Sequence, residues 1–451
     1  MHLQTSNERV NYALSKLMDI IDGTDYVGHI YAVGALVRCA MLGEEYKKNE
    51  IELVTDFKYG PKNVADYVTT VSECYNAVQN PKTYGKDYKT TFRFLADSNC
   101  NDVTITIVRA YGKIENDFSD RDFTIDSLYY NLSDKKVYDF SCHGINDCFS
   151  KTLRCCVDPA LSFLCDPIRM MRVLRLSIEL GYGIERETWF GLMRCVKKIN
   201  TAMVDELREE IERIMVMPKP SLVINKMLGC GLFEYVFQDV YDLKGYDQLR
   251  GTSYLKHSIE CMDMVSPLVT HRLSALYHEI GRVIAKKGEN ISSISADLSR
   301  IVFKEFEFDD DTTQEMVTAI RYHSYFSSFD TNALPSDSKI RRFMRHTEDF
   351  LAPTVDLMHA NNVCVINVRP KKVTQALNIL NKIEEIRKKD EEQGIKLPIS
   401  GDDIVKVLKV KKGPAVGFLL EKVKEKFKED DSLTREECLA YAKNFIKKLT
   451  T

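Results

Sequence analysis

The stretch "NEIELVTDF", Asn49–Phe57, has the composition of a β-strand with two acidic residues, Glu50 and Glu52, two positions apart. Side chains at positions i and i+2 of a strand point to the same face, so the two carboxylates should converge while Ile51 and Leu53 face a core. The pattern has two interpretations: a pair of metal ligands, or a solvated acidic strand. Taken alone it favours the second, because acidic residues are common on exposed strand faces.

A metal site on this strand would have a recognisable chemistry. Mg²⁺ takes oxygen ligands at roughly 2.0–2.1 Å, and two-metal phosphoryl transfer holds the ions ~3.5–4 Å apart. A third carboxylate from a neighbouring strand would complete the site. Asp102 is the candidate, because it opens the run "DVTITIVRA", in which Val103, Ile105 and Ile107 alternate with polar residues as in a half-buried strand.

A glycine turn precedes the acidic strand. The run "HIYAV" predicts a short strand, and it meets Gly34 before the helical pattern "ALVRCAMLG". A strand, a glycine and a helix start can present backbone N–H groups to a triphosphate, and Arg38 would add charge one turn into the helix. The alternative is an ordinary turn between a strand and a helix.

Composition limits the class of protein without naming one. The 451 residues include 63 Lys and Arg against 66 Asp and Glu, for a net charge of −3, so any basic surface must be local. The 13 Cys contain no C-x-x-C pair and predict reduced thiols, neither a disulfide framework nor a zinc site. The N-terminal pattern is that of an amphipathic helix, which predicts a cytoplasmic protein with no membrane span.

After about residue 155 the chain reads as helical. The segment "CDPIRMMRVLRLS", residues 165–177, has Arg169, Arg172 and Arg175 at intervals of three along one helix side. Asp166 and Arg169 together offer an acceptor and several donors, which suits reading the edge of a base. A plain amphipathic helix would show the same spacing.

Taken in order, the segments resemble class II CCA-adding tRNA nucleotidyltransferases and the similar bacterial poly(A) polymerases. The family pattern is a Gly-Gly-x-Val-Arg-Asp turn, an Asp-x-Asp strand, an Arg-Arg-Asp-Phe-Thr-Ile-Asn-Ala segment and a Glu-Asp-Pro-x-Arg helix start. This sequence has "GALVRC", "EIE", "DRDFTIDS" and "CDPIR" in the same order. The resemblance runs over nearly the whole chain.

The resemblance implies an α+β fold with a small mixed-sheet, polymerase-β-like head followed by an extended all-helical neck, body and tail. The expected boundaries are 1–140 for the nucleotidyltransferase head, 141–225 for a neck with the base-selecting motif, 226–330 for an HD-like body and 331–451 for an RNA-binding tail. It also implies a reaction, in which the 3′-hydroxyl of an RNA attacks the α-phosphate of ATP or CTP with Mg²⁺ or Mn²⁺ as the cofactor.

The family's functional residues carry over onto matching positions. Glu50 and Glu52 fall on the metal-binding acidic pair and Asp102 near the third acid. The positions implied for nucleotide binding are Gly34 and Arg38 in the phosphate turn, Arg121 and Asp122 for sugar and phosphate contacts, Asp166 and Arg169 for pairing with the incoming base, and Arg172 beside them.

Several motif positions depart from the family pattern. Both catalytic aspartates are glutamates, which keep the ligand atoms but add a methylene group and one more rotatable bond. The other changes are Ala35 for the second glycine of the turn, Cys39 for its Asp, Asp120 for Arg and Asp126 for Asn in the third motif, and Cys165 for Glu in the fourth.

Two further regions extend the resemblance. The segment "LKHSIECMD…HRLSALYHEIGR…AIRYH" looks like an HD-type region, with His257, His278-Glu279 and His323, but His-Asp has become His-Glu, and a helical scaffold is the expected role with His257 and His278 as packing residues. In the tail, Lys409, Lys411 and Lys412 precede a glycine turn that could bind an RNA backbone, or could be a solvated loop.

The sequence therefore predicts a metal-dependent enzyme that adds C, A or both to RNA 3′ ends, with tRNA as the leading substrate. Two alternatives stay open. One is a catalytically silent relative that binds RNA without extending it. The other is a metal phosphohydrolase working through His257, His278 and Glu279.

Overall fold

The structure is a computed structural model that describes residues 3–71, 89–95, 102–110, 112–248, 252–327, 334–364, 370–393, 397–410, 413–429 and 433–450. The chain forms two compact units, Met1–Ala202 with Lys226–Val236, and Met203–Asn225 with Phe237–Thr451. The four-part division proposed from the sequence stays a prediction at its stated boundaries. In the described part of the chain, no helix has the length and apolarity needed to span a membrane.

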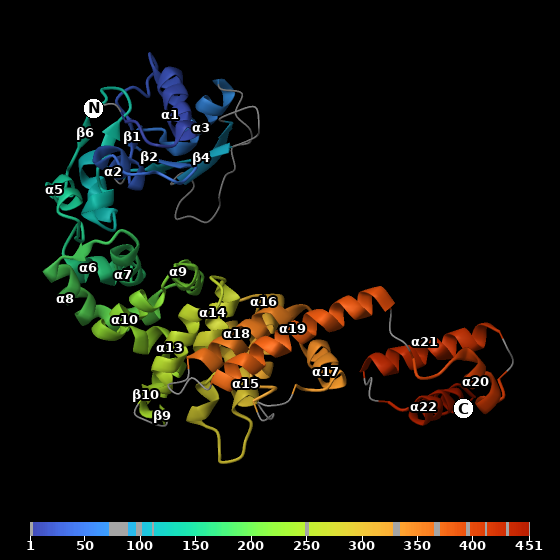
Figure 1. Ribbon diagram of the computed structural model, residues 1–451. Helices are drawn as coiled ribbons and strands as arrows, with labels where there is room; N and C mark the ends of the chain where they lie inside the picture. Colours follow the sequence, from blue (N-terminus) through green and yellow to red (C-terminus); the bar gives the residue numbers. More distant parts are fainter. Residues whose placement is uncertain are drawn as a thin grey trace. The chain divides into compact units, whose positions relative to one another are not determined.

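A six-stranded mixed sheet forms the centre of the first unit (Figure 1). Its strand order is β3-β4-β2-β1-β5-β6; β2 and β4 are parallel, and the other neighbours are antiparallel. The strands are β1 (Ile30–Ala32), β2 (Glu50–Thr55), β3 (Lys89–Leu95), β4 (Asp102–Arg109), β5 (Tyr129–Asn131) and β6 (Val137–Tyr138). The predicted mixed-sheet head followed by a long helical region is confirmed.

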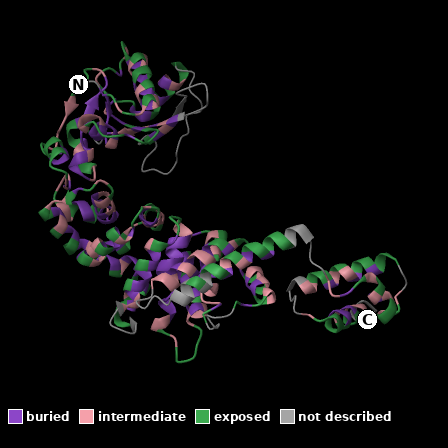
Figure 2. Cartoon of the chain, in the orientation of Figure 1, coloured by how far each residue is buried: buried purple, intermediate pink, exposed green. Residues whose placement is uncertain are grey.

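The sheet is buried as the alternation of its residues predicts. Val103, Ile105 and Ile107 of β4 are each 0% exposed, and Ile51 and Leu53 of β2 are 1% and 0% exposed. The sequence missed β5, because its three residues are all buried and show no alternation. Figure 2 shows the strands of the head as mostly buried.

Helices flank this sheet and continue beyond it. Helices α1 and α3 lie beside each other against the sheet in Figure 1. The helices of the first unit are α1 (Glu8–Ile21), α2 (Ala35–Leu42), α3 (Gly60–Val71), α4 (Ile114–Asp117), η1 (Phe118–Asp120), η2 (Thr124–Asp126), α5 (Gly144–Phe149), α6 (Pro159–Cys165), α7 (Arg169–Glu179), α8 (Arg186–Cys195), η3 (Val196–Thr201) and α11 (Phe233–Val236), and α10 (Ser221–Cys230) belongs partly to each unit. Two short strands, β7 (Thr152–Leu153) and β8 (Gly183–Ile184), pair in parallel.

The second unit is almost wholly helical. Its elements through residue 393 are α9 (Val204–Met215), α12 (Gln238–Tyr241), η4 (Asp242–Gly245), β9 (Asp247–Gln248), β10 (Thr252–Ser253), α13 (Tyr254–Met264), α14 (Val269–Tyr277), η5 (Ile280–Val283), α15 (Ile291–Glu305), α16 (Asp310–Tyr322), α17 (Asp337–Thr347), η6 (Glu348–Phe350), α18 (Leu351–Val363) and α19 (Pro370–Gln393). Its residues Ile340, Phe343 and Ile386 share an apolar cluster.

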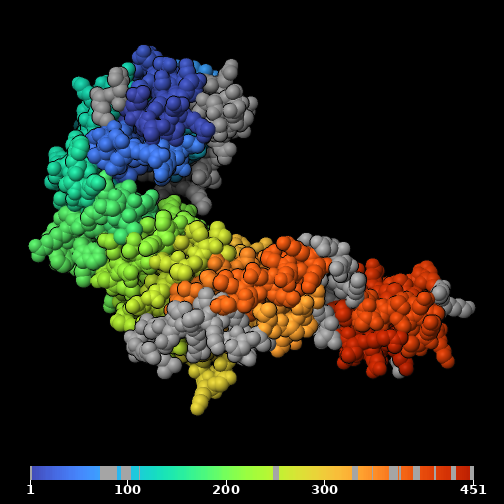
Figure 3. All heavy atoms as spheres, in the orientation of Figure 1, coloured from blue at the N-terminus to red at the C-terminus, as the bar shows by residue number. Residues whose placement is uncertain are grey.

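The last helices, α20 (Gly401–Leu408), α21 (Pro414–Glu429) and α22 (Arg435–Thr450), share an apolar cluster that includes Ile404, Val423 and Cys438. They are the red atoms at the C-terminal end of the chain in Figure 3. Lys409 ends α20 in the left-handed conformation and is exposed. Lys411 and Lys412 lie outside the described residues, so the predicted RNA contact of this turn stays a prediction.

Candidate active site

The acidic pair lies on the exposed face of β2. Glu50 and Glu52 are exposed while Ile51 between them is buried, as their spacing predicts. In the parallel pairing with β4, Glu50 is opposite Thr104 and Glu52 is opposite Thr106. The neighbours of the two carboxylates on the adjacent strand are therefore hydroxyl side chains.

Asp102 begins β4 and pairs with Leu95 of β3. It lies two residues before Thr104, the partner of Glu50, and so beyond the level of the acidic pair along the strand. Its assistance to the pair stays a prediction, and the register favours a site built mainly on Glu50 and Glu52.

Gly34 forms the turn that the sequence predicts, as the N-cap of α2. Its backbone has φ 75° and ψ −150°, a region that is almost exclusive to glycine. A Cβ atom at Gly34 would lie 3.6 Å from Oε2 of Glu52. The turn is therefore both conformationally demanding and close to the acidic pair.

We expect Gly34→Ala to lower the free energy of unfolding by about 1–3 kcal/mol, because alanine strongly disfavours this backbone conformation. It should also lower nucleotide incorporation, since the added methyl group faces Glu52. Denaturant unfolding and an incorporation assay measure the two effects. Gly23→Ala is the matched control: Gly23 also has a positive φ, 69°, but no atom lies within 4 Å of the added Cβ. Equal activity loss in both variants would contradict the proposed proximity effect.

Arg121 holds the Glu52 carboxylate. Nη1 of Arg121 donates to Oε1 of Glu52 at 2.6 Å, and Nε donates to Oδ2 of Asp117 at 3.1 Å. The guanidinium carbon lies 5.9 Å from the ring centroid of Tyr129, whose hydroxyl donates to Asp117 at 2.7 Å. Burial alone would lower the pKa of Arg121, but the Glu52 and Asp117 carboxylates raise it above its ordinary value, so the cation is firmly charged.

Arg38 is buried, and its exposed fraction is 4%. Its Nη1 donates to Oδ1 of Asp126, which lies in η2. Burial would lower the pKa of Arg38, and the Asp126 carboxylate outweighs that effect. Two departures from the family motif, Cys39 and Asp126, therefore balance in charge: the acid expected next to Arg38 is absent, and an acid in the third motif pairs with it instead. The structure places Arg38 inside the head, with Asp126 as its counterion.

We expect Arg38→Met to lower the free energy of unfolding by about 2–4 kcal/mol, because it leaves the partly buried Asp126 without its counterion. Adding Asp126→Asn should recover much of the loss, which a double-mutant cycle in denaturant would measure. Lys47→Met is the control: Lys47 forms an exposed pair with Glu45 at 3.3 Å, and such pairs contribute about 0–1 kcal/mol. Additive losses at residues 38 and 126 would contradict the pairing.

The segment expected to select the base, residues 165–177, contacts the third motif through Asp122. Oδ1 of Asp122 accepts from Nε of Arg169 at 2.8 Å, and Oδ2 accepts from Nη1 of Arg172 at 3.0 Å. Asp166 joins the same group, since its Oδ2 accepts from Nη1 of Arg172 at 3.1 Å. The sequence placed these residues in one site, and the structure brings their side chains together.

Arg169 is more constrained than the sequence suggested. Besides Asp122, its Nη1 donates to Oγ of Ser162 at 3.0 Å and its Nη2 donates to the carbonyl of Asp120 at 2.6 Å. The side chain is 10% exposed, against 26% for Arg172 and 28% for Asp166. Asp166 and Arg172 are therefore more accessible than Arg169, which the sequence expected to select the base together with Asp166.

The segment between these groups is anchored from behind. Phe123 and Cys155 form an isolated antiparallel β-bridge, and the Thr124 N–H donates to the Arg154 carbonyl at 3.0 Å. The Thr124 hydroxyl donates to Asp147 at 2.7 Å, and Arg154 donates to the same carboxylate at 2.9 Å. One short anchored stretch, residues 118–126, thus positions Arg121 toward Glu52, Asp122 toward Arg169 and Arg172, and Asp126 toward Arg38.

The HD-like residues lie in the second unit. His257 and His278 are each 0% exposed and His323 is 4% exposed. Burial lowers the pKa of His278, and that of His323, to about 3. The Glu279 carboxylate accepts from both Nε and Nη2 of Arg282, at 2.5 Å and 3.1 Å. The acid that a hydrolase would need is thus held by an arginine.

Residues 30–154 match the Poly A polymerase head domain family. The protein is a homologue of the CCA-adding enzymes and the poly(A) polymerases. The CC-adding tRNA nucleotidyltransferase of Thermus thermophilus is 23% identical over 362 residues, which cover 75% of this chain and 79% of that protein. Poly(A) polymerase I of Escherichia coli O157:H7 is 34% identical over 105 residues. This alignment covers 23% of this chain and only 22% of the polymerase.

Solved structures of related enzymes share the fold of this chain. The CCA-adding enzyme of Bacillus stearothermophilus in complex with CTP has a TM-score of 0.60 at 15% identity, covering 99% of this chain and 100% of that chain. A tRNA nucleotidyltransferase complexed with a primer tRNA and an incoming ATP analogue has a TM-score of 0.54 at 16% identity, covering 80% and 96%.

The prediction from sequence motifs missed three residues of this chain that support the site. Asp117 and Tyr129 hold Arg121, and Ser162 holds Arg169. None of them belongs to the motifs that were recognised. Asp117 carried one weak signal, since an acid four residues before Arg121 on a helical turn can form an ion pair.

Proposed function

We propose that this protein is an RNA nucleotidyltransferase that adds C, A or both to the 3′ end of RNA, with tRNA as the leading substrate and CTP and ATP as nucleotide donors. One observation carries the proposal: the single stretch 118–126 holds Glu52 through Arg121 and, one residue later, holds the Arg169, Arg172 and Asp166 group through Asp122. One stretch of chain thus links the acidic pair to the residues expected to read the base, which supports the proposal.

The acidic pair fits a divalent cation such as Mg²⁺ or Mn²⁺. Both carboxylates are exposed on one strand face and offer hard oxygen donors, and Mg²⁺ is commonly held by one or two carboxylates plus substrate phosphates. Bound there, the cation would neutralise charge on the triphosphate and help to ionise the attacking hydroxyl. Glu50 and Glu52 would hold it.

In the reaction, the 3′-hydroxyl oxygen of the RNA forms a bond to the α-phosphorus and the bond from that phosphorus to the β-phosphate oxygen breaks. The hydroxyl proton passes to solvent, and pyrophosphate leaves. Arg121 acts by orienting Glu52, whose longer side chain has one more rotatable bond than the aspartate of the family motif. A fixed orientation matters because a misplacement of ~1 Å can lower the rate ~10²-fold.

Base selection is assigned to Asp166 and Arg172, with Arg169 as a positioning residue. Asp166 supplies an acceptor and Arg172 a donor, and both side chains reach solvent. Arg169 donates hydrogen bonds to three groups of the protein and forms an ion pair with Asp166 at 3.5 Å, which keeps Asp122 and the helix start in register.

The direct test incubates the purified protein with Mg²⁺, labelled CTP or ATP, and tRNA that lacks its CCA end. Extension of the tRNA supports the proposal. Tight tRNA binding without extension, in Mg²⁺ and in Mn²⁺, would overturn it in favour of the silent RNA-binding relative.

A further inference from the structure

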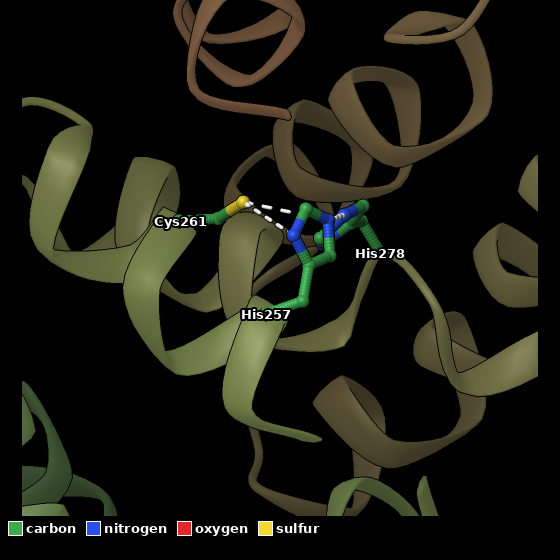
Figure 4. Close-up of side chains that lie close together, drawn as sticks. All are labelled: His257, Cys261 and His278. Carbon is green, nitrogen blue, oxygen red and sulfur yellow. Dashed lines mark hydrogen bonds between the residues drawn. The ribbon is translucent and has the colours of Figure 1, made fainter. Parts of the chain in front are cut away.

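Three side chains of the second unit form a cluster that the proposed function does not use. His257 and Cys261 lie one turn apart on α13, and His278 caps the C-terminal end of α14. All three are 0% exposed, and one ligand atom from each lies within 4.8 Å of the others. Figure 4 shows Cys261 and His278 on either side of the His257 ring.

The outer nitrogen of each histidine is committed to a backbone carbonyl. Nδ1 of His278 donates to the carbonyl of Ala275 at 2.7 Å, and Nδ1 of His257 lies 3.3 Å from the carbonyl of Cys364. Metal-binding histidines characteristically donate one ring N–H in this way, which leaves the other nitrogen as a ligand. Here the two remaining nitrogens, both Nε2, face each other at 3.3 Å.

His257 also lies beside the Asn361 side chain, whose Oδ1 is 3.0 Å from Nε2 of the ring. When each histidine carries its N–H on Nδ1, toward its carbonyl, the Nε2 lone pairs of the two rings face each other at 3.3 Å. A cation between the rings would accept both lone pairs.

Two of the three separations between the ligand atoms match tetrahedral coordination, and the third, between Cys261 and His278, lies within 4.8 Å. Bonds of roughly 2.0–2.1 Å to nitrogen and 2.3 Å to sulfur give tetrahedral N···N separations of about 3.3–3.4 Å and N···S separations of about 3.5–3.6 Å. The two Nε2 atoms are 3.3 Å apart, and Sγ of Cys261 lies 3.6 Å from Nε2 of His257 and 3.8 Å from its Nδ1.

We propose that His257, Cys261 and His278 bind a thiophilic divalent metal ion of the zinc type as a structural centre joining α13 and α14. On binding, the Cys261 thiol loses its proton to solvent and ligates as the thiolate. The thiol of Cys364, a hydrogen-bond partner of Cys261, and the side-chain oxygen of Asn361, 3.0 Å from Nε2 of His257, are candidate donors for the fourth position. Asn361, which contacts His257, also lines a pocket of about 740 Å³ beside the cluster.

This centre differs from the phosphohydrolase considered from the sequence. Its third ligand is a thiol instead of Glu279, whose carboxylate pairs with Arg282, and all three ligands are buried. A sulfur ligand disfavours Mg²⁺, which the acidic pair of the head would take, and favours zinc or cobalt. The acidic pair of the head and the His–Cys cluster should therefore be distinguishable by the metal ion that each prefers.

The test is metal analysis of the full chain, purified under reducing conditions, incubated with Zn²⁺ and desalted. We expect about one zinc per chain, as for a closed structural site. In cobalt-loaded protein we expect the d–d bands of tetrahedral Co²⁺ and a thiolate-to-cobalt band in the near ultraviolet. Cys261→Ser should lower the zinc content at least ~10-fold, and removing zinc with a chelator should lower the midpoint temperature of the wild-type protein.

Matched variants separate this site from others. Cys438→Ser removes an equally buried thiol, at 0% exposure, from the apolar cluster of α20–α22 and should leave the zinc content unchanged. Glu52→Gln, in the acidic pair, should also leave it unchanged. Substoichiometric zinc in the wild-type protein with no thiolate-to-cobalt band would overturn the proposal, and this result does not depend on any variant folding.

Discussion

Replacing Glu52 with Gln is expected to lower the rate of nucleotide incorporation into tRNA by about 10³-fold, which corresponds to about 4 kcal/mol of transition-state stabilisation. The amide keeps the size of the side chain and can still accept a hydrogen bond from Arg121, so the local fold should persist. It loses the charge that the divalent cation requires. Incorporation of labelled CTP or ATP into tRNA lacking its CCA end, at saturating Mg²⁺, is the measurement.

Two companion variants sharpen this result. Glu115→Gln changes an exposed carboxylate of the same unit and should leave incorporation unchanged. Glu52→Asp restores the residue type of the family motif but shortens the side chain whose carboxylate accepts from Arg121 at 2.6 Å. We therefore expect the incorporation rate to fall by about 10²-fold. Full activity in Glu52→Gln would show that this carboxylate does not hold the catalytic cation.

The sequence predicted the head well because its signals are local. Alternating burial in β4 and the acidic pair on β2 follow from the period of a strand, and both are present. The three residues of β5 escaped because they are buried by long-range packing between β1 and β6, a property that no short window of sequence records.

The partners of the charged residues could not be read from motifs. Arg38 was expected to face phosphate, yet it pairs with Asp126, 88 residues away. The Arg121 to Glu52 contact spans 69 residues, and the Asp122 to Arg169 contact spans 47. Spacing along the chain identifies which residues share a strand or helix face, whereas these contacts depend on how the elements pack.

Charge balance explains why the motif departures are tolerated by the fold. An acid is missing after Arg38, and another has appeared at Asp126, so the head retains one counterion for its buried arginine. Cys165, in place of the Glu before Asp166, is exposed and leaves the Asp166 ion pairs intact. The departures therefore change which acidic residue pairs with which arginine, and Arg38, Arg169 and Arg172 each keep an acidic partner.

The second large effect is expected for Asp122→Asn, which removes the negative charge shared by Arg169 and Arg172. The free energy of unfolding should fall by about 1–3 kcal/mol, because the amide keeps one acceptor oxygen but no longer neutralises two guanidinium groups. We also expect kcat/KM to fall by about 10²-fold, together with a change in the ratio of CTP to ATP incorporation. Steady-state incorporation with each nucleotide measures both quantities.

The nucleotide ratio distinguishes positioning from simple loss of stability. A variant that is only partly folded loses activity equally with CTP and ATP, whereas a displaced Arg172 and Asp166 edge alters the two unequally. Asp120→Asn is the matched control: Asp120 contacts Arg169 through its backbone carbonyl, its side chain is exposed, and its substitution removes the same charge two residues away. If Asp120→Asn shifts the ratio of CTP to ATP incorporation as far as Asp122→Asn does, the shift results from the general electrostatic field of the site. That result would exclude the hydrogen bonds from Arg169 and Arg172 to Asp122 as its cause.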